Sequence, residues 1–197
     1  MLHRIAIKAA TLVLKNEQDG EADKEQYIYG FEVILGKTLT YIILFVIGSV
    51  LNLFFEMLVF ISFVIFLRGQ TGGYHLNNSF GCIFCTTAIS IFSILLANNI
   101  KYQFAISVLP VLVFISILVI CIYSPINHPN LLLNKQEARR CAKCSMLFTG
   151  IELLIVTLLI LFRAKESIII SACLGIVVVA ILMIVAKIIK QEVPYYE

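Results

Sequence analysis

The chain has 197 residues, of which 60% are hydrophobic and only 14% charged, and its formal net charge is +3. Soluble domains carry about 25% charged and about 45–50% apolar residues, so this composition excludes a soluble globular domain. The small, dispersed positive charge forms no basic stripe interleaved with aromatic residues, which excludes a nucleic-acid-binding protein.

The apolar residues are gathered in runs long enough to cross a bilayer, for which a helix needs about 20 residues. A strand that crosses lipid leaves its backbone unpaired unless a barrel closes, and the alternating pattern of barrel strands is absent. We therefore predict an all-α polytopic membrane protein with six transmembrane helices. Residues 1–197 are expected to form a single membrane-embedded domain.

Residues 1–30 are predicted to begin with an amphipathic helix in the membrane interface. Leu2, Ile5 and Ala6 open an apolar face at helical spacing, while Arg4 and Lys8 fall on the opposite side. This pattern is typical of a helix that lies in the plane of the membrane surface. The acidic stretch that follows, residues 17–25, is expected to be a solvated loop.

The six predicted spans cover residues of about 33–51, 53–67, 80–97, 104–123, 145–162 and 168–189. Lys and Arg concentrate on the cytoplasmic flanks of membrane spans. With both termini in the cytoplasm, twelve of the 15 Lys and Arg residues lie on that side. The bias predicts a multi-pass protein of the cell membrane whose segments 68–82 and 124–145 face the cytoplasm.

The segment between the second and third spans, RGQTGGYHLNNSFGC, carries the candidate chemistry. Its Gly, Asn and Ser residues predict a break between helices, and Ser79 or Asn78 is the best N-cap for the third span. With Ser79 as the cap, Cys82 is the third helical residue, where the positive end of the helix dipole favours a thiolate. A loop between them would let His75 reach Cys82 as a general base. The alternative is a loop histidine and a cysteine that merely packs.

The sequence RGQTGGYH at 68–75, followed by Cys82, resembles the signature of the accessory gene regulator B family of quorum-sensing membrane peptidases. The segments YIYGFE at 27–32 and YSPINHPN at 123–130 also resemble that family, so the likeness covers nearly the whole chain. The resemblance implies that Cys82 is the nucleophile and His75 the base, with Arg68 and Gly73 as supporting residues.

The same resemblance implies a substrate and a reaction. The protein would cut the C-terminal tail from a short pro-peptide similar to accessory gene regulator D and hold the rest as a thioester on Cys82. A thiol or hydroxyl of the peptide would then close a cyclic thiolactone or lactone. The resemblance also implies a homodimer in the lipid bilayer, and no metal or organic cofactor is needed.

Other polar residues have both a functional and a structural interpretation. Glu152, about two turns inside the fifth predicted span, is a functional candidate because of its depth. It could orient His75, although pairing within the bundle or with Lys143 is the favoured interpretation. The basic residues of segment 124–145 satisfy the charge bias whatever the function, and they could also hold the acidic tail of the pro-peptide. These residues are Lys135, Arg139, Arg140 and Lys143.

The third span carries a stripe of small polar residues at helical spacing, which predicts a face toward the bundle interior. The stripe consists of Cys82, Thr86, Ser90 and Ser93. Two C-x-x-C pairs, at 82–85 and 141–144, suggest a zinc or redox site only weakly, because both are in or next to apolar helices.

The rival function is a small peptide transporter in which the Gly-Gly segment is a hinge.

Overall fold

The computed structural model describes residues 2–13, 21–74, 79–127, 133–191 and 193. Within these ranges there is no β-strand, and all helices except α1 are long and apolar enough to cross a membrane. The predicted all-α fold with six spans is therefore confirmed. The helices are α1 (Leu2–Val13), α2 (Glu21–Val50), α3 (Phe54–Thr71), α4 (Ser79–Asn99), α5 (Tyr102–Tyr123), α6 (Lys135–Leu161) and α7 (Glu166–Ile188).

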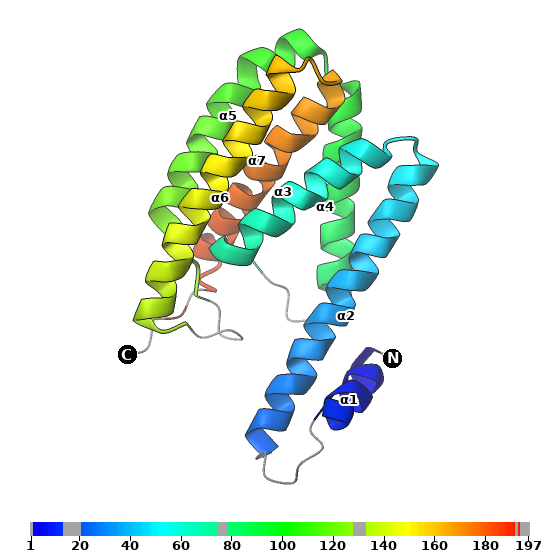
Figure 1. The fold of residues 1–197 in the computed structure, drawn as a ribbon, viewed down its shortest axis with the longest axis vertical. Coiled ribbons are helices and arrows are strands. Elements are labelled where there is room, and N and C mark those ends of the chain that lie inside the picture. Colours follow the sequence, from blue (N-terminus) through cyan, green and yellow to red (C-terminus); the bar gives the residue numbers. More distant parts are fainter. Residues whose placement is uncertain (1, 14–20, 75–78, 128–132, 192, 194–197) are drawn as a thin grey trace.

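Helix α7 is the centre of the bundle (Figure 1). Its span is 67% buried within the protein, compared with 17–39% for the other five spans, and helices α3, α4, α5 and α6 all pack against it. At Gly175 the backbones of α7 and α3 approach so closely that a Cβ would lie 2.8 Å from the Cβ of Phe63. Helices α3 and α7 therefore form a tightly packed pair.

Helix α1 lies beside α2 (Figure 1). Ala6 and Ala10 are fully buried, whereas Arg4 and Lys8 are exposed. Small side chains allow two helix backbones to approach closely. Part of the predicted apolar face thus packs on α2, whereas Ile5 is 44% exposed. The placement of α1 in the membrane interface stays a prediction.

Helices α2 and α3 are both longer than predicted. Helix α2 begins at Glu21, so residues 21–25 of the acidic stretch are helical, and the prediction of a loop there is wrong. Helix α3 continues to Thr71, so Arg68 lies in its last turn. The break between the helices begins at Gly72, whose N–H donates to the carbonyl of Arg68.

Helix α6 begins at Lys135 rather than at residue 145. Its start is a capping box: the side chain of Asn134 accepts from Glu137 N at 2.8 Å, and Asn134 N donates to Glu137 Oε2 at 2.9 Å. The four basic residues predicted to lie in a cytoplasmic loop are therefore on the first turns of a helix.

Candidate active site

The turn after α3 is fixed by three hydrogen bonds. Thr71 O accepts from Ile126 N at 2.9 Å, and Tyr74 N donates to Leu182 O at 3.2 Å. Within the turn, Arg68 Nη2 donates to Tyr74 O at 2.6 Å. Thr71 is thus held against Ile126, just after α5, and Tyr74 is held against α7.

Glycine is required at both central positions of this turn. The φ angles of Gly72 and Gly73 are 68° and 133°, in a region that residues with a side chain rarely adopt. A Cβ on Gly72 would also lie 2.7 Å from Ile126 O. The Gly-Gly pair in the sequence therefore has a physical cause, which is a strained turn pressed against a neighbouring loop.

We expect Gly72→Ala to destabilise the protein by about 1–3 kcal/mol, because the new side chain is strained and meets a backbone carbonyl. Gly69→Ala is the matched control, since a Cβ at that α3 position meets nothing within 4 Å. Thermal unfolding in detergent would measure both. Equal midpoints for the two variants would contradict the close approach to Ile126.

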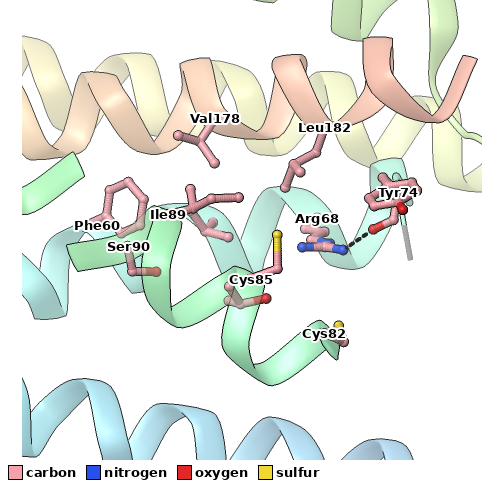
Figure 2. Close-up of a pocket in the computed structure, with 11 residues that line it drawn as sticks. Phe60, Arg68, Tyr74, Cys82, Cys85, Ile89, Ser90, Val178 and Leu182 are labelled. Atoms are coloured by element: carbon pink, nitrogen blue, oxygen red, sulfur yellow. Dashed lines mark hydrogen bonds between the residues drawn. The ribbon is translucent and has the colours of Figure 1, made fainter. Parts of the chain in front are cut away.

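A small cavity of about 30 Å³ lies between the first turns of α4, the end of α3 and α7 (Figure 2). That volume is enough for a water-sized group. It is lined by the polar or thiol side chains of Arg68, Tyr74, Cys82, Cys85, Thr86 and Ser90 and by the apolar side chains of Phe60, Val64, Ile89, Val178 and Leu182. The cavity thus brings the predicted nucleophile and the predicted arginine together.

Cys82 is the fourth residue of α4, because Ser79 is its first helical residue rather than its cap. The thiol is nevertheless near the N-terminal end of the helix, where the dipole is positive. Figure 2 shows Arg68 between Cys85 and Tyr74, and Arg68 interacts electrostatically with both Cys82 and Cys85. A permanent cation in this place stabilises negative charge that develops on sulfur or on a substrate oxygen.

The predicted polar stripe of α4 does face the bundle interior. Ser90 and Ser93 are buried, and Thr86 lines the cavity beside Cys82. Sequence reasoning did not find Tyr41 of α2, which interacts electrostatically with Arg68 and Cys82. A single tyrosine in an apolar run carries no pattern that would have indicated this.

His75, the predicted base, lies outside the described residues, as do Asn77 and Asn78. Its preceding neighbour, Tyr74, lines the cavity that Cys82 also lines. The pairing of His75 with Cys82 therefore stays a prediction. Gly73, the other supporting residue, lies in the turn and is buried there against α7.

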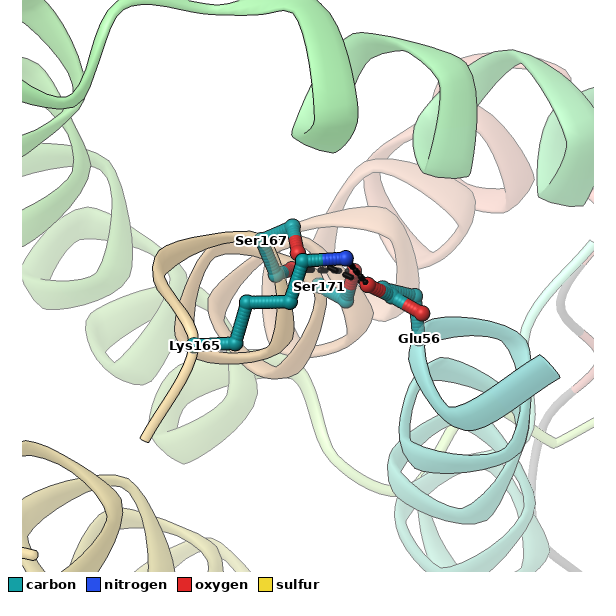
Figure 3. Close-up of polar contacts among 4 residues, drawn as sticks. All are labelled: Glu56, Lys165, Ser167 and Ser171. Carbon is teal, nitrogen blue, oxygen red and sulfur yellow. Dashed lines mark hydrogen bonds and ion pairs between the residues drawn. The ribbon is translucent and has the colours of Figure 1, made fainter. Parts of the chain in front are cut away.

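Two glutamates are buried within the spans, and they differ in their partners. Glu56 Oε1 accepts from Lys165 Nζ and from Ser167 Oγ, both at 2.7 Å (Figure 3). Both carboxyl oxygens of Glu152 are buried with no hydrogen-bond partner among the described residues. The expected pairing of Glu152 with Lys143 or within the bundle is therefore not seen there.

Because α6 begins earlier than predicted, Glu152 lies about 25 Å along the helix axis from the first residue of the helix, Lys135. It is not among the residues that line the cavity. Its role in orienting His75 stays a prediction.

The basic residues of α6 form an exposed face, which we call the basic face. Lys135, Arg139 and Lys143 follow one another at intervals of four residues, and Arg140 lies beside them. All four side chains are exposed. Because the segment is helical, successive charged residues at four-residue intervals are separated by about 6 Å along the helix axis. The basic face therefore presents cations at a fixed spacing.

All six cysteines are free thiols. Within the described ranges, no three His, Cys, Asp or Glu side chains are grouped as metal ligands would be. Helix α4 carries Cys82 and Cys85, and helix α6 carries Cys141 and Cys144.

Comparison with known proteins gives a match to the family model of AgrB, described as Accessory gene regulator B, over residues 6–186. No curated protein and no solved structure matches the chain. The matched region includes the Gly-Gly turn, the cavity and the basic face.

Proposed function

The chain belongs to the accessory gene regulator B family, whose members process quorum-sensing peptides, and on this premise we propose that it is a membrane cysteine endopeptidase. Its substrate is a pro-peptide similar to accessory gene regulator D, from which it removes the C-terminal tail. The observation that carries the proposal is the shared cavity, in which Cys82 at the start of α4 lies with Arg68 beside the Gly-Gly turn.

In the proposed reaction, His75 takes the proton of the Cys82 thiol, and the thiolate attacks the carbonyl carbon of the scissile bond. The C–N bond then breaks, and His75 gives the proton to the departing amine. A thiol or hydroxyl of the peptide attacks the resulting thioester, closes the ring and releases Cys82. No ATP is needed, because the thioester retains part of the energy of the cleaved amide.

Arg68 has a specific place in this scheme. One guanidinium nitrogen donates to Tyr74 O, and a guanidinium has five N–H donors in all. The remaining donors are available to stabilise the oxyanion of the tetrahedral intermediate or the charge on Cys82. Arg68 would therefore both fix the turn and act on the reacting atoms.

The direct test is to incubate the reconstituted protein with the pro-peptide and to trap the acyl adduct by rapid acid quench. Mass mapping should place the adduct on Cys82. A peptide transporter, the second candidate, would move the pro-peptide across vesicles without any adduct. A homodimer is proposed from family membership alone.

We further propose that both termini, the Gly-Gly turn and the basic face are cytoplasmic, in line with the distribution of Lys and Arg. In intact cells, a cysteine introduced at Lys101 should react with a membrane-impermeant thiol reagent, whereas one at Gln136 should be protected. Both positions are exposed on the protein. The reverse labelling pattern would place the site on the wrong side for a newly made pro-peptide.

The basic face is proposed to bind the acidic tail of the pro-peptide. Replacing Arg139 and Arg140 with Gln should raise the apparent KM more at low than at high ionic strength, because salt already screens the wild-type contact. Lys101→Gln is the control, since it removes an exposed cation from the opposite end of the bundle. An unchanged KM at both salt concentrations would leave the basic face with only a topological role.

A further inference from the structure

The cavity beside Cys82 has room for about one oxygen atom. Its volume of about 30 Å³ is that of a single water-sized group. When a cysteine attacks a carbonyl carbon, the carbonyl oxygen becomes an oxyanion next to the sulfur. The open space therefore matches the reacting oxygen of a substrate in size.

Two hydroxyl groups of α4, those of Thr86 and Ser90, line this cavity. Many helical hydroxyls of the chain donate instead to the backbone carbonyl four residues earlier. Examples are Thr40, Ser62, Ser116, Thr149 and Ser171. Thr86 Oγ1 and Ser90 Oγ make no hydrogen bond to another described residue. Their O–H groups are therefore available to donate into the cavity.

Thr86 is the hydroxyl next to the nucleophile. It follows Cys82 by four residues on α4, and side chains at that spacing share a helix face with Cβ atoms about 5–6 Å apart. An oxygen atom beside the Cys82 sulfur would thus lie within reach of Thr86 Oγ1. Ser90 lies about 12 Å from Cys82 along the axis, and Figure 2 shows it toward the far end of the cavity, whereas Arg68 lies near Cys82.

We propose that the cavity is the oxyanion site of the cysteine reaction and that Thr86 is a further catalytic residue, whose hydroxyl donates to the oxyanion together with Arg68. The inference rests on the proposed function. As the Cys82 sulfur attacks, the electron pair of the C=O bond moves to the oxygen, and it returns when the leaving group departs. Thr86 therefore neither gains nor loses a proton. Donors that are in place beforehand lower the barrier because they need no reorganisation.

Two small reagents separate this role from an effect on the thiol itself. p-Nitrophenyl acetate acetylates the Cys82 sulfur through a tetrahedral oxyanion and releases p-nitrophenolate. Iodoacetamide alkylates the same sulfur by displacing iodide, and no oxyanion forms. Peptide mapping of the full-length protein in detergent follows both reactions at Cys82 and distinguishes it from the other thiols. Neither reagent requires knowledge of the natural cleavage site.

Thr86→Val removes the hydroxyl and nearly keeps the shape of the side chain. It should slow acetylation of Cys82 by about 10²-fold, a loss typical of removing one oxyanion donor, and leave the rate of alkylation unchanged. Thr86→Ser should restore most of the acetylation rate. Thr87→Val is the matched control, because its hydroxyl is also without a hydrogen-bond partner among the described residues but does not line the cavity. Both of its rates should equal those of the wild type.

Thr86→Ala is the second variant and should show the same selective loss if the valine variant does not fold. Wild-type acetylation in these variants would overturn the inference, as would an equal loss in both reactions, which would mean that Thr86 acts on the thiol or on the fold. If the pro-peptide is cleaved through Cys82 and Thr86→Val cleaves it at the wild-type rate, only the role of Thr86 is wrong. If acetylation shows the selective loss but no pro-peptide is ever cleaved, the proposed function fails and the oxyanion site stands.

Discussion

Cys82→Ala is expected to abolish both cleavage of the pro-peptide and its covalent adduct, whereas Cys85→Ala should retain both. The two thiols line the same cavity, and both interact electrostatically with Arg68, so neither the cavity nor the charge separates them. The two thiols differ in their position on the helix: Cys82 is in the first turn of α4, and Cys85 lies about 4.5 Å further along the axis. The helix dipole acts mainly within that first turn.

Mass mapping of the trapped adduct, together with cleavage assays of the two alanine variants, would measure this difference. A zinc site or a disulfide made by the C-x-x-C pair predicts comparable damage from either substitution. An adduct on Cys85, or full activity in Cys82→Ala, would show that the nucleophile has been misassigned.

His75→Ala is expected to slow acylation of Cys82 by about 10²–10⁴-fold, the loss typical of removing a general base. The residue before it, Tyr74, donates its N–H to Leu182 O and accepts at its carbonyl oxygen from Arg68, and it lines the cavity together with Cys82. The rate of thioester formation by rapid quench is the measurement. Added imidazole should restore part of the rate, because it can take the proton from the thiol.

His3→Ala, in helix α1, is the control and should leave the rate unchanged. An acylation rate in His75→Ala equal to the wild type would mean that another group activates Cys82. A slow rate that imidazole does not improve would assign His75 a structural role instead.

The fold was largely predictable because six apolar runs and their interruptions are local features of the sequence. The start of α6 was missed because its first turns are charged and do not register as hydrophobic, although Asn134 and Glu137 have the spacing of a capping box. The part of the acidic stretch that belongs to α2 was missed for the same reason. Hydropathy locates the portion of a helix in lipid, not the portion that extends beyond it.

The site was predictable only in part. The motif indicated Cys82 and Arg68, and the structure places them on one cavity. The contact of Gly72 with Ile126 joins residues more than fifty positions apart, and no local pattern encodes such a contact. The lack of a hydrogen-bond partner for Glu152 among the described residues likewise depends on how α6 packs.

The ion pair of Glu56 with Lys165 acts at the opposite end of the two helices that form the cavity walls. It fixes the start of α3 to the start of α7, and Arg68 lies about 18 Å further along α3. The pair is therefore a pivot for any tilt of α3 against α7. A tilt of about 5° around it would move the Arg68 end by about 1.5 Å over that length. A contact remote from Cys82 thus restricts how far α3 can tilt against α7 beside the cavity.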